Sequence, residues 1–272
     1  MATTGTRLRS RGGVRSDTLP RQDLVVVLAC VAGMTALAWG YLVHLDREMS
    51  AMLTADRMMA DMGMVMNRPW TAADVLVTFV MWAVMMVGMM SASATPVLLL
   101  FGGALRGRGE RRAWPSVALF GLGYLLVWCL FSGGAALLQA ALHQAALLSP
   151  VMAAANPRLG GAILIGAGIY QLTPWKGACL AHCRSPLGFL MSHWRGGRLG
   201  ALRMGARHGW YCLGCCWALM CVLFVVGVMN LVWVAALSVF VLLEKAGPSG
   251  LVMARVSGAL MLVAGLAGVS AR

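Results

Sequence analysis

Long apolar stretches separated by short polar segments dominate the pattern of the chain. The longer stretches contain about twenty or more apolar residues, which is enough for a helix to cross a hydrocarbon core ~30 Å thick. Apolar residues follow one another without alternating with polar ones, so the pattern favours helices over a membrane β-barrel. The sequence therefore predicts an all-α fold, a polytopic transmembrane helical bundle.

Turn residues and basic segments divide the apolar stretches into about seven predicted spans. These spans cover approximately residues 24–45, 72–105, 117–142, 159–174, 207–227, 230–243 and 251–269. The fifth and sixth spans come from one stretch that is too long for a single crossing, and we expect it to break near Gly227 to Asn230. Residues 23–272 thus form one predicted transmembrane domain, preceded by a basic tail, residues 1–22, that we expect to be disordered.

The distribution of charge predicts the orientation of the bundle. The net charge is +13, from 22 Lys and Arg residues against 9 Asp and Glu residues, and the arginines concentrate in residues 1–22, 106–112 and 174–207. The positive-inside rule puts all three segments in the cytoplasm. Residues 46–70, which are rich in methionine, then form an extracytoplasmic segment. We expect a multi-pass protein of a bacterial inner membrane with a cytoplasmic N-terminus, and the loop charges require no nucleic-acid partner.

Methionine is the first candidate for chemistry. Of the 21 methionines, 12 lie between Met49 and Met90. Those of the second predicted span form a stripe that includes Met85, Met86, Met89 and Met90. Thioethers are soft ligands that select Cu(I) over hard cations. Packing is an alternative interpretation of the stripe, because methionine also fills gaps between helices.

Cysteine and histidine give the stronger pattern, since two clusters lie about 30 residues apart. The first cluster is C-x-x-H-C and the second is H-x-x-x-C-x-x-C-C; they contain Cys179, His182 and Cys183, and His208, Cys212, Cys215 and Cys216. Helical spacing puts each cluster on one face, so antiparallel packing would bring several thiols and up to two imidazoles together. Clustered thiols in a reducing compartment are typical of metal binding or thiol redox chemistry. Burial of cysteines as small apolar residues is the structural alternative.

The spacing of these clusters is not that of a zinc ribbon or of an iron–sulfur ferredoxin, so it specifies no single metal.

Several stretches resemble a bacterial family of predicted metal-binding integral membrane proteins, domain of unknown function 2182. They are MWAVMMVGMM (81–90), YQLTPWKGACLAHCRSPLGFL (170–190), HWRGGRLGALRMGARHGWYCLGCCWALM (193–220) and VGVMNLVW (226–233), together with Glu244 and Lys245. The resemblance implies a metal-binding membrane protein and assigns no reaction.

Few polar residues lie within the predicted spans, where each is costly. We expect Glu244 and Lys245 at the membrane interface, in an ion pair or a topological role. The chain has no evident intramembrane carboxylate pair, P-loop, dinucleotide fingerprint or nucleophile elbow, which disfavours primary active transport. The sequence favours a non-catalytic protein and leaves an enzyme open.

Three hypotheses of function remain open. The first is a membrane metal-binding protein that transfers or stores a soft metal, Cu(I) above others, through its Met and Cys/His ligands. Its expected partners are the lipid bilayer and other membrane or metal-delivery proteins. The second is a membrane thiol–disulfide oxidoreductase in which Cys212 and Cys215 exchange with Cys179 and Cys183. The third is a structural accessory subunit of a larger membrane complex.

Overall fold

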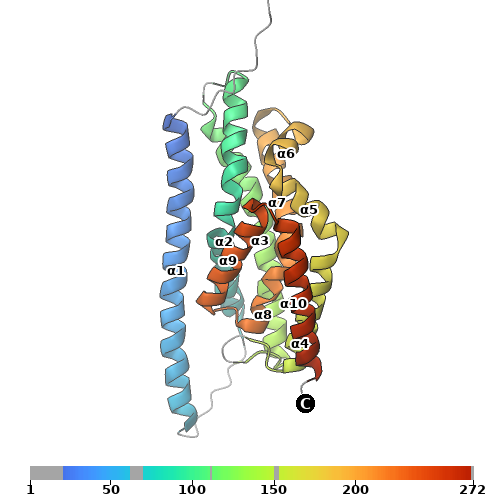
Figure 1. Ribbon diagram of the computed structural model, residues 1–272. Coiled ribbons are helices and arrows are strands. Elements are labelled where there is room, and N and C mark those ends of the chain that lie inside the picture. Colours follow the sequence, from blue (N-terminus) through green and yellow to red (C-terminus); the bar gives the residue numbers. More distant parts are fainter. Residues whose placement is uncertain (1–20, 62–69, 111, 150–152, 271–272) are drawn as a thin grey trace, which may run out of the picture.

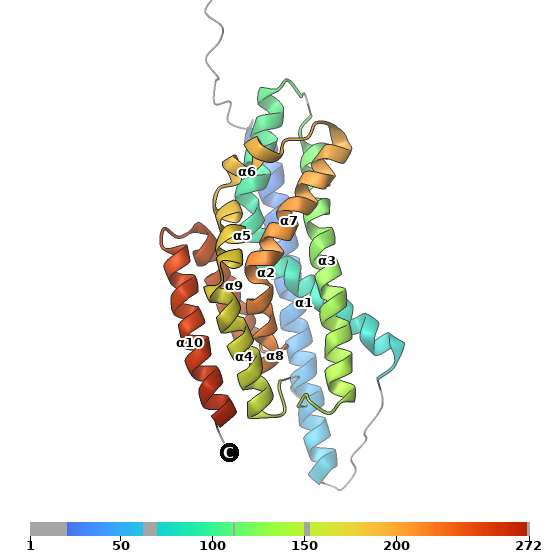
Figure 2. The same cartoon turned by 90° about the vertical axis from the view of Figure 1, so that its right-hand side faces the viewer.

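The computed structural model describes residues 21–61, 70–110, 112–149 and 153–270, which form an elongated bundle of helices (Figures 1 and 2). The helices are α1 (Arg21–Asp61), α2 (Ala72–Gly107), α3 (Trp114–Gln144), α4 (Pro157–Leu172), α5 (Pro174–Arg184), α6 (Pro186–His193), α7 (Gly197–Cys221), α8 (Leu223–Val226), α9 (Leu231–Ala246) and α10 (Gly250–Ser270). The expected all-α fold is confirmed.

Side chains before the helices explain several of their starting points. Thr71 and Asp74 form a capping box at α2, and Thr173 caps α5 directly before Pro174. Asn230 accepts a hydrogen bond from the Trp233 N–H at the start of α9. The break expected near Gly227 to Asn230 is confirmed, because Gly227 has a φ of 98°, a conformation that glycine adopts readily, between α8 and α9.

Five helical segments in the described part of the chain are long and apolar enough to cross a membrane. They are Arg21–Met52, Ala72–Gly107, Trp114–Gln144, Gly197–Val226 and Gly250–Ser270. The helices at the fourth and sixth expected spans, α4 and α9, have 16 residues each, fewer than the roughly 20 that a full crossing needs. The bundle is thus compatible with a membrane protein, but the expected number of about seven spans is not confirmed.

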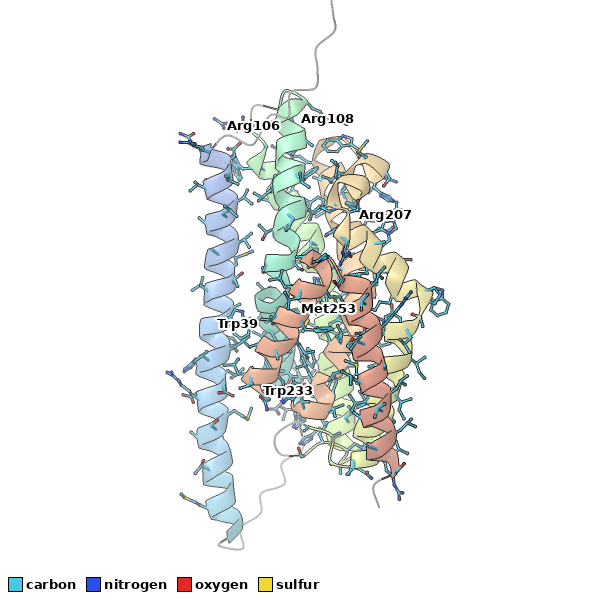
Figure 3. The ribbon with its side chains drawn as sticks, viewed as in Figure 1. Trp39, Arg106, Arg108, Arg207, Trp233 and Met253 are labelled. Atoms are coloured by element: carbon cyan, nitrogen blue, oxygen red, sulfur yellow. The ribbon has the colours of Figure 1, made fainter. Side chains whose placement is uncertain are left out.

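The basic segments gather towards one end of the bundle. Arg106, Arg108 and Arg207 lie in the upper part of Figure 3, where α1 begins, and Arg106 pairs with Asp23 of α1. The C-terminus lies at the opposite end (Figure 1). The side of the membrane that each end faces stays a prediction.

Two expected segments differ from what we find. Residues 174–207, expected as a loop, form α5, α6 and the first turns of α7. Residues 46–61 of the expected methionine-rich segment continue α1 as a helix, while residues 62–69 and the tail 1–20 lie outside the described residues.

Two charged side chains in the last turn of α9 are buried among the other helices. In Figure 1, α9 rises from the lower half of the bundle and stops part-way up, and α10 begins nearby and runs back down. Glu244 and Lys245, in the last turn of α9, are only 0% and 9% exposed. The expected ion pair is found for Glu244, which pairs with Lys176 of α5, whereas Lys245 contacts Cys212 of α7. Their position relative to a membrane interface stays a prediction.

Candidate metal centre

The cysteines of α5 and α7 meet because the two helices pack closely. Cys212, Cys215 and Cys216 lie on the buried face of α7, separated by three residues and by one. Gly214 allows the close approach of α5, since a Cβ atom there would lie 2.7 Å from the Cys179 Sγ. Tyr170, at the end of α4, fixes the same point by donating a hydrogen bond to the Gly214 carbonyl.

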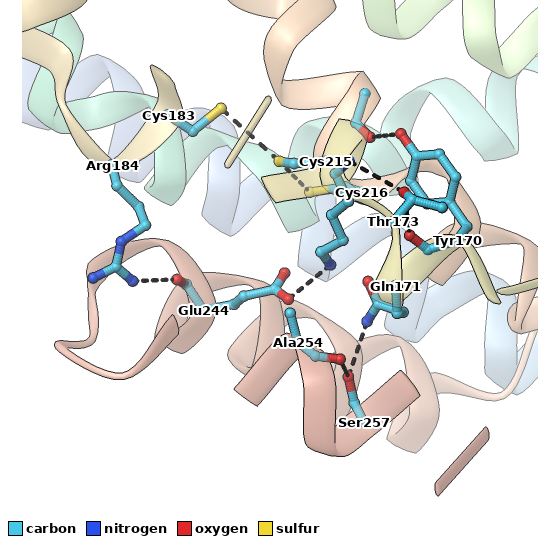
Figure 4. A network of polar contacts seen from close by, with 12 residues as sticks. Tyr170, Gln171, Thr173, Cys183, Arg184, Cys215, Cys216, Glu244, Ala254 and Ser257 are labelled. Carbon is cyan, nitrogen blue, oxygen red and sulfur yellow. Dashed lines mark hydrogen bonds and ion pairs between the residues drawn. The ribbon is translucent and has the colours of Figure 1, made fainter. Parts of the chain in front are cut away.

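Sulfur contacts link the two clusters (Figure 4). The Cys215 Sγ lies 3.2 Å from the Cys216 Sγ and 3.9 Å from the Cys183 Sγ. All eight cysteines of the chain are free thiols, so no disulfide connects these sulfurs. The predicted convergence of the two clusters is therefore found at Cys183 and Cys215, and Cys215 in turn contacts Cys216.

Cys212 has a polar environment of its own. The Lys245 Nζ lies 2.9 Å from the Cys212 Sγ, and the Tyr124 hydroxyl lies 3.0 Å from the same sulfur. The Lys245 ammonium also donates to the Ser93 Oγ at 3.2 Å and contacts the Met90 Sδ at 4.0 Å. A thiolate at Cys212 would thus have a countercharge and a hydrogen-bond donor in direct contact, the setting in which thiolates act as metal ligands.

A buried ion pair lies beside the thiols. The Lys176 Nζ is 2.7 Å from the Glu244 Oε1, with both side chains at most 1% exposed. Arg184 donates from Nη1 to the Glu244 carbonyl at 2.8 Å and from Nη2 to the Pro248 carbonyl at 3.2 Å. Figure 4 shows Cys183 directed towards Cys215, while the neighbouring Arg184 is directed towards the end of α9. Three cationic side chains therefore surround the site, against one carboxylate.

The methionine stripe of α2 faces the same core. Met85, Met86, Met89 and Met90 are at most 3% exposed and pack in one cluster with Cys212, Cys215 and Cys216. The stripe is thus buried in protein, as both packing and metal binding would require.

The two predicted histidine ligands have different surroundings. The His182 ring stacks on Tyr211, with ring centroids 4.2 Å apart, and its Nδ1 lies 2.9 Å from the Ala178 carbonyl. His208 is only 3% exposed and packs against the rings of Phe120, Tyr124 and Phe189. His208 thus lies in the buried region near the thiols, whereas His182 belongs to an aromatic stack.

The described residues contain no group of three or more His, Cys, Asp or Glu side chains already arranged around a metal position. The donors that do converge are thiols with a thioether nearby, which is a set of soft ligands. Such a set fits Cu(I) and not Mg²⁺ or Ca²⁺, which take oxygen ligands.

A comparison with known protein families matches residues 79–268 to PpoB2, a copper chaperone. The chain belongs to the PpoB2 copper chaperone family. The matched range contains every thiol of the two clusters, the methionine stripe and Lys245. This confirms the expectation of a metal-binding family, and supports copper as its metal; the name domain of unknown function 2182 is not confirmed. No curated protein and no solved structure matches the chain.

The sequence analysis did not predict two contacts of Cys212. One is with Lys245 and the other is with Tyr124. Lys245 stood out as a charge at the end of an apolar stretch, which is a signal for function within a membrane. Tyr124 lies in the apolar third span and gave no signal, because its hydroxyl finds Cys212 only through the packing of α3 on α7.

Proposed function

We propose that this protein binds Cu(I) as its cargo inside the helical bundle and passes it to an acceptor, with the thiolates of Cys183, Cys212, Cys215 and Cys216 as ligands. The sulfur contacts of Cys215 with Cys183 and Cys216, beside Cys212 on the same buried face of α7, are the observation that carries the proposal. Membership of a copper chaperone family supports copper over other soft metals.

The charges around the thiols support a thiolate-bound metal. A Cu(I) ion held by any two of these four thiolates carries one net negative charge, and burying a charge without a partner is strongly unfavourable. Lys245, in contact with the Cys212 sulfur, supplies the countercharge at that position. Binding in this arrangement releases the two thiol protons and leaves the oxidation state of copper unchanged.

The thioethers of α2 add further soft metal ligands beyond the cysteines. Met90 reaches the Lys245 ammonium beside Cys212, and Met85, Met86 and Met89 continue the stripe along α2 in the same core. In our proposal they hold copper weakly during movement along the bundle, in a membrane where the basic end faces the cytoplasm.

Elemental analysis of the detergent-purified protein, with thiol titration before and after chelation, tests the proposal. We expect about one copper per chain, with thiols that are masked until a Cu(I) chelator removes the metal. Cys212→Ser and Cys183→Ser should lower the bound copper sharply. Cys221→Ser is the matched control, because Cys221 is a half-buried thiol at the end of the same helix.

The same measurements separate the other two hypotheses. A chain that takes up no copper even when its thiols are reduced, and that is purified with a reversible disulfide between Cys183 and Cys215, would favour the oxidoreductase and contradict the proposal. A chain without metal and without a disulfide would favour the structural subunit.

A further inference from the structure

A cavity of about 210 Å³ opens beside the thiols, between α2, α5, α7 and α9. Its lining includes Ser93, Cys183, Arg184, His208 and Lys245. Cys183 is the cysteine of the cluster that lines this cavity among the described residues, and its sulfur also contacts Cys215. The thiol of Cys183 therefore connects the cavity to the buried cluster.

His208 has an unused polar atom in the same place. The ring is only 3% exposed and lies between aromatic side chains, and its Nδ1 has no hydrogen-bond partner among the described residues. A buried polar atom without a partner is unfavourable. Because His208 lines the cavity, a polar molecule in the cavity can supply the missing partner.

The charge of the cavity selects the form in which copper can arrive. Arg184 and Lys245 line it, and its described lining contains no Asp or Glu. The hydrogen bonds of Arg184 go to the neutral carbonyls of Glu244 and Pro248 rather than to a carboxylate. Free Cu(I) is a cation and would be repelled here, whereas a Cu(I) ion that already carries two thiolates is an anion and would be attracted.

We propose that this cavity receives copper as an anionic bis-thiolate complex of Cu(I) with a low-molecular-mass thiol, and that Cys183 is the first residue to take the metal. This inference rests on the proposed function and names the substrate of the same site. The volume of the cavity supports a small thiol, because it is below the roughly 300–1,000 Å³ typical of pockets for drug-sized ligands.

The transfer is an exchange of ligands without oxidation or reduction. The Cys183 thiol loses its proton and its sulfur bonds to Cu(I); one arriving thiolate leaves and takes up that proton as a free thiol. The His208 Nδ1 forms a hydrogen bond with the departing thiol or its polar tail. A second exchange at Cys215, 3.9 Å from Cys183, releases the other thiol in the same way.

Three donors of similar size and different charge test the inference on the full-length protein in an uncharged detergent under anaerobic conditions. They are the bis-thiolate Cu(I) complexes of 3-mercaptopropionate, 2-mercaptoethanol and cysteamine. In that order, the net charge of the complex changes from strongly negative to positive. Stopped-flow measurement of copper transfer should give rates that fall in that order. The Arg184→Gln variant should reduce the ratio of the first rate to the last by about tenfold, the lower end of electrostatic steering effects.

Arg207→Gln is the matched control, because it removes the same charge at a position outside the cavity. Arg207 is an exposed arginine of α7 next to His208 in sequence. It should change the ratio by less than about twofold. His208→Leu, which removes the unpaired ring nitrogen, should slow transfer from all three donors. Equal rates for the three donors in the wild-type protein would overturn this inference, and so would an equal fall of the rate ratio in Arg184→Gln and Arg207→Gln. In either case, copper uptake would still support the proposed function. If the protein takes up copper from none of the donors, both proposals fail.

Discussion

Replacement of Lys245 by methionine tests the countercharge that the proposed copper site requires. The Lys245 Nζ and the Cys212 Sγ are 2.9 Å apart, and two unit charges at that distance attract by about 6 kcal/mol at an effective dielectric constant of about 20. A Cu(I) ion bound by two thiolates leaves one negative charge shared between two sulfurs, of which one contacts the ammonium. About half of the attraction, roughly 3 kcal/mol, should therefore be lost, which weakens Cu(I) binding about a hundredfold.

Competition with a chromophoric Cu(I) chelator under anaerobic conditions measures this change in affinity. Methionine suits the test because it has a similar length and leaves a soft side chain beside Met90. Arg207→Met removes a cation at an exposed position of α7 and should change the affinity by less than about twofold. A thermal unfolding scan shows whether Lys245→Met has folded, and Lys245→Arg, which keeps the charge, should recover most of the affinity. Affinity of a folded Lys245→Met variant within about threefold of the wild-type value would refute the electrostatic argument.

The remaining predictions concern packing, the ion pair and sulfur proximity. Gly205→Ala should lower the stability of the bundle by about 1–3 kcal/mol in thermal unfolding, because the new Cβ would lie 1.9 Å from the Phe120 carbonyl oxygen of α3. Gly134→Ala is the control and should not destabilise the bundle, because the space around Gly134 is open. Glu244→Gln should lower stability by about 3–5 kcal/mol, since it leaves the buried Lys176 without its carboxylate; an unchanged unfolding temperature would contradict the pairing. A mild oxidant should join Cys183 to Cys215 in the copper-free protein, detectable by mass spectrometry, and bound copper should protect both.

The spacing of residues along α7 predicted the thiol cluster well. Cys212, Cys215 and Cys216 share a face in any α-helix, so the sequence alone placed them together, and the second cluster at Cys179 and Cys183 indicated where a partner face lay. Which thiol touches which depends on the close approach of α5 at Gly214. Such an approach depends on the packing of whole helices, which spacing within one helix does not describe.

The sequence predicted an ion pair or a topological role for Glu244 and Lys245, but their partners could not be predicted from their position in the sequence. Neighbours in a helix point in different directions, so the two side chains do not pair with each other. Glu244 pairs with Lys176 of α5, and Lys245 contacts Cys212 of α7. The sequence pattern showed two charges at the end of an apolar stretch, and only the early end of α9 within the bundle explains why both are buried.

The end of α9 also accounts for the balance of charge at the site. Irregular backbone within an apolar bundle is tolerated where other groups satisfy its carbonyls or where it lines a cavity. Here Arg184 satisfies the carbonyls of Glu244 and Pro248, and the cavity adjoins Ala246. Lys176 has the Glu244 carboxylate, but the described contacts of Lys245 are a hydroxyl and two sulfurs, none of them a permanent anion. A negative charge nearby stabilises a buried ammonium, and in the proposed site the Cu(I)-bound thiolate of Cys212 would supply that charge.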